Sequence, residues 1–352
     1  MRSLSWDTHV SLALARSAPV AIGVSGGKDS QAAALATTRH LDAIGHAGPR
    51  LLVHSDLGVV EWNDSLRICQ QLADFLKVEL LVLRRRAGDL MDRWEARWRS
   101  SVERYESLST VTLVLPWSTP SMRFCTSELK TQVIEPALKR RWREYPVIVN
   151  VTGVRRDESP ARAKVASATF DQRTGFLHWR PIADWDVSDV FSEIDASGLA
   201  PHPAYRQFGM SRVSCRFCIM SKIDDMKAAV SQTESHDLYR RMVDLECRST
   251  FAFQGSRWLG DLRPDLLSSP AALSTAKSRS ALRRDWESRI TPGMLYVKGW
   301  PTRMLTDAEA ELLASIRRSI SGQLGFKSTC LHRDDIHQRY AELIARREVR
   351  AA

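Results

Sequence analysis

No segment of the sequence approaches the roughly 18 apolar residues that a membrane-spanning helix needs, and the first residues lack the pattern of a secretory signal peptide. We therefore expect a cytoplasmic protein. Internal repeats and low-complexity tracts are also absent, which excludes a repeat protein. Cysteine is scarce, with six in 352 residues. Because cytosolic thiols stay reduced, we interpret these cysteines as free, metal-bound or redox-active rather than as a disulfide framework.

The composition is that of a folded, basic protein. An apolar content of 43% is ordinary for globular chains, and 352 residues suffice for one large domain with an appended element, or for two domains. The net charge of +10 favours a polyanionic partner. Several tryptophans neighbour arginines, which suits contacts with bases and phosphates, but for each patch alone we favour a helix with tryptophan facing inward. These patches are Arg93-Trp94, Arg97-Trp98-Arg99, Arg141-Trp142-Arg143 and Arg284-Asp285-Trp286.

A glycine-containing turn joins an apolar run, residues 19–24, to the helix-forming residues 31–40. A strand, a glycine turn and a helix N-terminus in this order form an anion cradle, since backbone N–H groups and the helix dipole face the anion. The turn matches neither the P-loop nor the dinucleotide-binding motif. It predicts phosphate binding by Ser25, Gly26, Gly27, Lys28 and Ser30, with Lys28 and Asp29 as candidate catalytic residues.

Strand and helix patterns alternate along the first half of the chain. We expect strands at 50–54, 78–83 and 146–152, and helices at 61–77, 88–105 and 126–142. This alternation predicts an α/β fold with a mostly parallel, doubly wound sheet, whose ligands bind at the carboxyl ends of the strands. Beyond Gly153 the alternation stops, and helices are expected at 186–196 and 224–248. We expect a first domain over 1–220 and a basic, mainly helical C-terminal element over 221–352.

Six motifs in one order resemble those of the phosphoadenosine phosphosulfate (PAPS) reductase and N-type ATP pyrophosphatase superfamily, whose members share the PP-loop. The resemblance extends over about Ala21–Met220, implies an adenine nucleotide alpha hydrolase-like fold, and is nearer to the DNA-modification and defence-associated members than to the assimilatory reductases. The tail after Phe251 resembles no family. The motifs are residues 25–30, His54-Ser55-Asp56-Leu57-Gly58, Cys125-Thr126 with Leu129-Lys130, Gly153 to Arg162, Arg180-Pro181-Ile182 with Trp185, and His202-Pro203-Ala204-Tyr205.

Three side chains in these motifs have alternative roles. Asp56, our third candidate catalytic residue, follows a strand and can accept hydrogen bonds from a ribose or a base, or orient Lys28; the alternative is a turn-forming aspartate. Arg155 and Arg162 can contact phosphate or sulfate oxygens. The alternative is that Glu158 pairs with one of them and makes the cluster structural.

Three cysteines form a candidate metal site. Cys215 and Cys218 have the spacing of metal ligands, and Cys125 is the third ligand if the two segments meet. The fourth ligand is open among Cys247, Cys330 and a histidine such as His202. The resemblance to proteins that phosphorothioate DNA implies an iron–sulfur cluster, and Zn²⁺ suits the same spacing. Structural thiols without metal are the alternative.

Two departures separate the chain from the assimilatory reductases. Phe124 replaces the first cysteine of their Cys-Cys pair, and Cys330-Leu331-His332 lacks the glutamate and glycine of their C-terminal nucleophile motif. We therefore expect an enzyme that acts on nucleic acid, DNA rather than RNA, using ATP or a related nucleotide for phosphate activation or sulfur transfer. One alternative is a hydrolase that cleaves DNA or excises a modified base in phage defence. Another is a non-catalytic, nucleotide-sensing DNA-binding protein.

Overall fold

The computed structural model describes residues 2–351, and the chain divides into two compact units. Unit 1 comprises Met1–Leu90 and Pro120–Ser235, and unit 2 comprises Met91–Thr119 and His236–Ala352. The division differs from the expected one in two respects. The boundary lies at residue 235 rather than 220, and residues 91–119 belong with the C-terminal residues.

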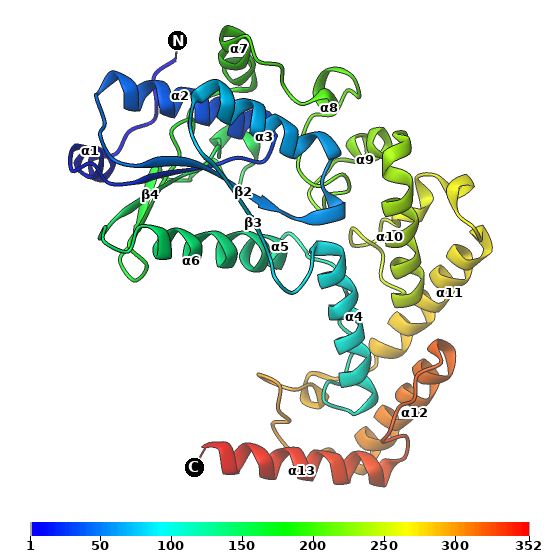
Figure 1. Cartoon of the computed structure of the whole chain (residues 1–352). Helices are drawn as coiled ribbons and strands as arrows, with labels where there is room; N and C mark the ends of the chain where they lie inside the picture. Colours follow the sequence, from blue (N-terminus) through cyan, green and yellow to red (C-terminus); the bar gives the residue numbers. More distant parts are fainter. Residues whose placement is uncertain (1, 352) are drawn as a thin grey trace. The chain divides into compact units, whose positions relative to one another are not determined.

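Unit 1 contains a six-stranded sheet in the order β3-β2-β1-β4-β6-β5 (Figure 1). All neighbouring pairs are parallel except β5 and β6, which are antiparallel. Helices α2 and α3 lie on one face and α6 on the other, so the predicted α/β fold is confirmed. The strands are β1 (Val20–Gly23), β2 (Arg50–Asp56), β3 (Leu80–Arg84), β4 (Ile148–Val151), β5 (Ala168–Asp171) and β6 (Phe176–Trp179). The helices are α1 (Thr8–Ala15), α2 (Lys28–Ala43), α3 (Asn63–Leu76), α5 (Phe124–Thr126), α6 (Gln132–Arg141), α7 (Val187–Ser197), α8 (Pro203–Arg206) and α9 (Ile223–Val230).

The central strand β1 is buried on both faces of the sheet. Val20, Ala21 and Ile22 of β1 are fully buried, because α2 covers one face of the strand and the other face packs on Trp142 and Leu138. A strand that is buried on both faces has a continuous run of apolar residues in its sequence. This is why β1 could be predicted from the sequence. The carboxyl ends of β1 and β4 therefore meet at one edge of a rigid sheet.

Two features after β4 differ from what the sequence analysis describes. The hairpin of β5 and β6 was not predicted, because its four-residue strands are too short to show a clear alternation. The helix expected over 224–248 is two helices, α9 and α10 (His236–Ser249), separated by the short turn Thr233–Ser235. The intervening Ser231-Gln232-Thr233 segment has modest helix propensity, which permits the break.

Unit 2 is helical, as expected for the C-terminal element. Its core joins Leu313 and Ala314 of one helix to Ile336 and Tyr340 of another, with Met294 between them. Among residues 2–351, no helix combines the length and apolar content needed to cross a membrane. The helices are α4 (Leu90–Glu106), which begins at the end of unit 1, α10, α11 (Pro270–Glu287), α12 (Asp307–Leu324) and α13 (Arg333–Ala351). The short 3₁₀ turns are Leu259–Asp261, Pro264–Leu266 and Pro292–Met294.

The tryptophans near arginines are mostly core residues. Trp94 and Trp98 of α4 are buried, and Trp94 packs edge-to-face on Trp117 at 5.3 Å between ring centroids. Trp98 packs on Phe251 in the same way. Trp142 is also buried. The interpretation of inward-facing tryptophan is therefore confirmed for these residues, and these contacts explain why residues 91–119 belong to unit 2.

Buried Arg317 connects distant segments of unit 2 through hydrogen bonds. The Arg317 guanidinium is fully buried and donates to the carbonyls of Tyr105, Glu106, Thr329 and Cys330, at 2.7–3.1 Å. It thus ties the C-terminal end of α4 to the loop before α13. A guanidinium suits this role because its donors point in several fixed directions.

Candidate functional site

The predicted anion-binding turn lies between β1 and α2. Gly26 has φ +74°, and a Cβ there would lie 2.8 Å from the Ser65 Cα, so only glycine fits. Gly27 is the N-cap of α2. The Ser30 hydroxyl donates to the Gly27 carbonyl at 2.9 Å and accepts from the Ser25 N–H at 3.2 Å. These contacts close the turn into a PP-loop at a helix N-terminus.

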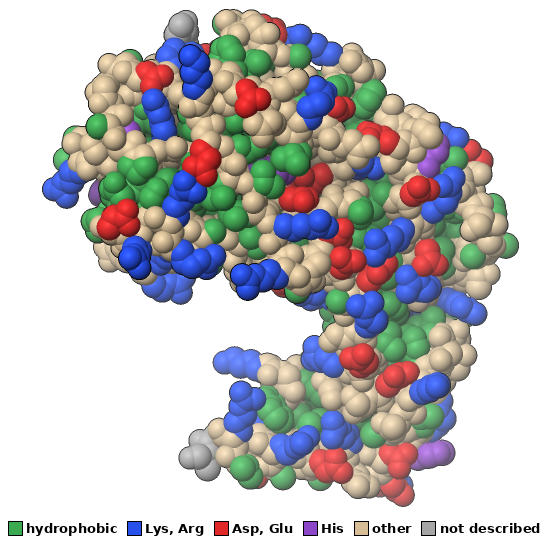
Figure 2. All heavy atoms as spheres, viewed as in Figure 1, with side chains coloured by type: hydrophobic (Ala, Val, Ile, Leu, Met, Phe, Trp, Pro, Cys, Tyr) green, Lys and Arg blue, Asp and Glu red, His purple; other side chains and the backbone are tan. Residues whose placement is uncertain are grey.

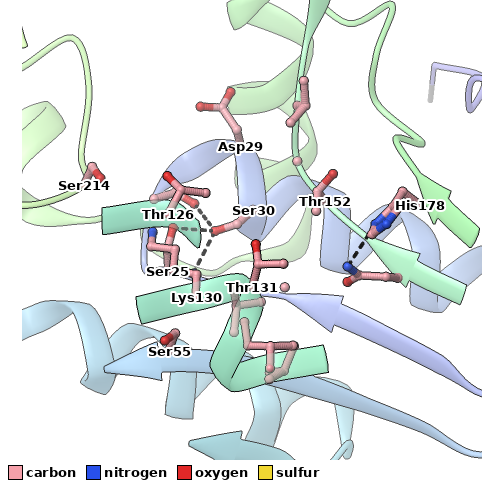
Figure 3. A pocket seen from close by; sticks show the side chains of 18 of the residues that line it. Ser25, Asp29, Ser30, Ser55, Thr126, Lys130, Thr131, Thr152, His178 and Ser214 are labelled. Atoms are coloured by element: carbon pink, nitrogen blue, oxygen red, sulfur yellow. Dashed lines mark hydrogen bonds between the residues drawn. The ribbon is translucent and has the colours of Figure 1, made fainter. Parts of the chain in front are cut away.

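A pocket of about 390 Å³ opens at this loop, at the carboxyl ends of β1 and β4. Ser25, Gly27, Asp29 and Ser30 line it from the loop (Figure 3). A single π-helical turn, Ser127–Thr131, brings Lys130 and Thr131 into the wall. On the β4 side lie Thr152, Gly153, Asn150 and His178, the last two hydrogen-bonded at 3.2 Å.

Three cations line the pocket: Lys130, Arg162 and Arg212. Arg162 pairs with Glu158, which also lines the pocket. The side chains of Lys130 and Arg212 make no hydrogen bond or ion pair with any described residue. Burial, followed by the charges of Arg212 and Arg123, lowers the pKa of Arg162. Positive charges that repel one another beside a helix N-terminus form a site for an anion.

Lys28 and Arg155 are paired with Asp29 rather than placed in the pocket wall, and their predicted roles in phosphate binding stay predictions. The Lys28 side chain is buried: its Nζ lies 3.1 Å from the Asp29 carboxylate and 5.0 Å from the centroid of the Tyr205 ring. Arg155 is also buried and donates to Asp29 at 2.7 Å, to Asp157 at 2.9 Å and to the Trp185 carbonyl at 3.2 Å. Neither side chain lines the pocket. Both cations hold Asp29 in place, because a buried charge needs a partner of opposite sign.

Asp56 forms a turn. Its carboxylate accepts the Gly58 N–H at 2.7 Å, and Asp56 does not line the pocket. This contact agrees with the alternative interpretation of a turn-forming aspartate, and the catalytic role of Asp56 stays a prediction.

Several residues at the site were not predicted from the sequence. The Tyr205 hydroxyl accepts the Lys28 N–H at 3.0 Å, so it occupies one backbone donor of the loop. Both nitrogens of buried His54 face acceptors, the Val24 carbonyl and the Glu61 carboxylate, each at 3.1 Å. Burial opposes its charge, but hydrogen bonds to Cys69 and Glu61 raise the pKa of His54 to about 10. Tyr205 and Lys130 stand in recognised motifs, whereas nothing in the sequence marks Arg212.

The three cysteines of the predicted metal site border the pocket without forming a ligand set. Cys125 precedes Thr126 and Cys215 precedes Ser214, and both neighbours line the pocket. Burial first, and then the charges of Cys218, Glu61 and Cys125, raise the pKa of Cys215. Within residues 2–351, however, no group of three or more His, Cys, Asp or Glu side chains is arranged to hold a metal ion. The backbone of Cys215 is bridged to Glu61, which fixes its position. In this arrangement, Cys125, Cys215 and Cys218 therefore do not form the predicted metal site.

The fold and the loop define the class of protein. Residues 19–221 match the phosphoadenosine phosphosulfate reductase domain, and the chain belongs to this family. The adenosine 5'-phosphosulfate reductase of Mycolicibacterium smegmatis is 34% identical over 73 residues, 21% of this chain and 30% of that protein. The match thus spans under a third of this curated relative.

Two solved structures are similar to this chain. A PAPS reductase of Candida auris in a phosphate complex has a TM-score of 0.34 and 16% identity, covering 56% of this chain and 80% of that one. The U34-tRNA thiolase NcsA of Methanococcus maripaludis, with its [4Fe-4S] cluster, has a TM-score of 0.34 and 12% identity, covering 72% and 82%.

Proposed function

We propose that this chain is a PP-loop enzyme that binds a nucleotide through its phosphate groups and uses it to modify nucleic acid, DNA rather than RNA. The observation that carries the proposal is the pocket in which the glycine loop faces Lys130 and Arg212, two cations without a partner among the described residues. Such cations are stabilised by a ligand that brings its own negative charge. A nucleoside triphosphate is a ligand with this negative charge.

Adenylation is the activation step that we favour. The substrate oxygen forms a bond to the α-phosphorus of ATP, the bond to the β-phosphate breaks, and pyrophosphate leaves. Backbone N–H groups at the start of α2, together with Lys130 and Arg212, would stabilise the negative charge that builds up on the phosphates. For sulfur transfer, the sulfur would come from an external persulfide donor; Cys125 and Cys215 are next in sequence to two residues that line the pocket.

The position of Cys330 supports a departure from sulfonucleotide reduction. Its carbonyl accepts from buried Arg317 at 3.0 Å, and neighbouring Thr329 donates its N–H to the Glu106 carbonyl at 2.9 Å. The segment is thereby anchored inside unit 2. A mobile nucleophile needs a segment free to move, so this anchoring agrees with the missing nucleophile motif.

Titration calorimetry with ATP tests the binding part of the proposal. Arg212→Ala and Lys130→Ala should each weaken ATP binding about tenfold or more, because each removes a charge-assisted contact worth about 1.5–3 kcal/mol. Arg173→Ala is the matched control, since Arg173 is exposed in unit 1 and lies outside the pocket. Equal affinity in all three variants would show that the pocket is not the nucleotide site.

Turnover assays test the reaction. Incubation with ATP and duplex DNA should release pyrophosphate in a DNA-dependent manner. Abasic sites that form without ATP would instead indicate base excision, and binding without turnover would indicate a nucleotide sensor. Release of sulfite from a sulfonucleotide in the presence of a thiol reductant would contradict the nucleic-acid substrate.

A further inference from the structure

The last turns of α13 extend beyond the core of unit 2. The buried side chains of this 19-residue helix are spaced at helical intervals, at Ile336, Tyr340 and Leu343. The same stripe continues with Arg347 and Arg350, and both are exposed. The face that packs on the core in the first half of the helix therefore carries arginine in the second half.

A tight hairpin lies beside these turns. Val297 and Trp300 exchange backbone hydrogen bonds at 2.8 and 3.1 Å, and Lys298 and Gly299 between them have φ of 51° and 87°. Positive φ at both central residues defines a type I′ turn, which holds the tip rigidly. Lys298 at the tip is exposed, and Arg347 donates to the Pro301 carbonyl at 3.2 Å, which fastens the helix to the hairpin.

The charge on this surface is largely unneutralised. The side chains of Arg346, Arg350 and Lys298 are exposed and make no hydrogen bond or ion pair with another described residue. Figure 2 shows Lys and Arg side chains gathered where the hairpin and the end of α13 lie. Other exposed arginines of unit 2, by contrast, are paired with carboxylates, as Arg303 is with Glu309 and Arg318 with Glu311.

We propose that this surface, formed by Lys298, Arg346, Arg347 and Arg350, binds the phosphate backbone of duplex DNA. The proposal rests on the proposed function, in which nucleic acid is the substrate, and assigns the residues that hold it. An exposed helix end of this kind fits the wide major groove of B-form DNA, whereas the major groove of A-form RNA is too narrow.

The test is a salt titration of DNA binding by the full chain, followed by fluorescence anisotropy with a labelled 20-base-pair duplex. Arg346→Ala/Arg350→Ala should reduce the slope of log affinity against log salt by about 1.8, since each phosphate contact contributes about 0.9. When salt is raised from 50 to 200 mM, the factor by which DNA affinity falls should thus be about tenfold smaller for the double variant than for the wild type. Both side chains are exposed, so the melting temperature should change little.

The matched control is Arg279→Ala/Arg284→Ala, which removes the same charge from exposed positions on α11. An unchanged slope in this control supports the proposal. Equal slopes in both double variants would overturn it, as would equal binding to duplex RNA or to vesicles of anionic lipid. ATP binding and turnover test the pocket separately. Equal slopes in the two double variants would contradict the DNA-binding surface but not ATP-dependent turnover. Absence of turnover would contradict the proposed reaction but not the DNA-binding surface.

Discussion

Replacing Asp29 by alanine should destabilise unit 1 strongly, although Asp29 borders a pocket. Its carboxylate bridges two buried cations, Lys28 at 3.1 Å and Arg155 at 2.7 Å, whose side chains are only 6% and 3% exposed. Removing one partner of a buried ion pair leaves an uncompensated charge and costs about 3–5 kcal/mol. For a unit of this size, such a loss lowers the melting temperature by about 6–20 °C.

The matched control is Asp157→Ala. Asp157 contacts the same guanidinium at 2.9 Å, but its side chain is 56% exposed. An exposed pair contributes about 0–1 kcal/mol, so this variant should melt within about 4 °C of the wild type. Differential scanning fluorimetry and urea unfolding measure both variants. If Asp29→Ala and Asp157→Ala melt at the same temperature, the carboxylate does not bridge the two cations, and the reasoning is refuted.

Three further predictions concern the loop and two buried titratable groups. Gly153→Ala should abolish ATP binding in calorimetry, because its Cβ would lie 2.4 Å from the Asp29 carbonyl oxygen, whereas Gly322→Ala, with open space around it, should not. The pKa of His54 is raised to about 10, so its contribution to stability is complete below about pH 6.5 and is lost as pH rises through 10. His54→Gln should therefore flatten the decline in urea stability over this range, and an unchanged decline would contradict an imidazolium at this position. Burial raises the pKa of Glu246 to about 7, against hydrogen bonds from three backbone N–H groups. Its contribution is complete below about pH 4.3 and is lost as pH rises through 7, so Glu246→Gln should remove that part of the pH dependence of unfolding, which pH-resolved melting curves will detect.

The PP-loop, the parallel sheet and the family could be predicted from the sequence because each depends on neighbouring residues. A buried strand, two glycines and a run of helix formers are consecutive in the chain, and β1 and α2 formed where this pattern placed them. The β5–β6 hairpin was missed because strands of four residues leave too short a pattern to recognise.

The tertiary structure decided which charges meet. Asp29 and Arg155 are 126 residues apart, and only the adjacency of β1 and β4 turns Arg155 from a candidate anion ligand into the partner of a carboxylate. Folding likewise buries Lys28 against Asp29 and brings Lys130 and Arg212 into the pocket. Local patterns set backbone conformation, because conformational preferences add up along consecutive residues. The partner of a charged side chain depends on which distant segments pack together, and no local pattern encodes that.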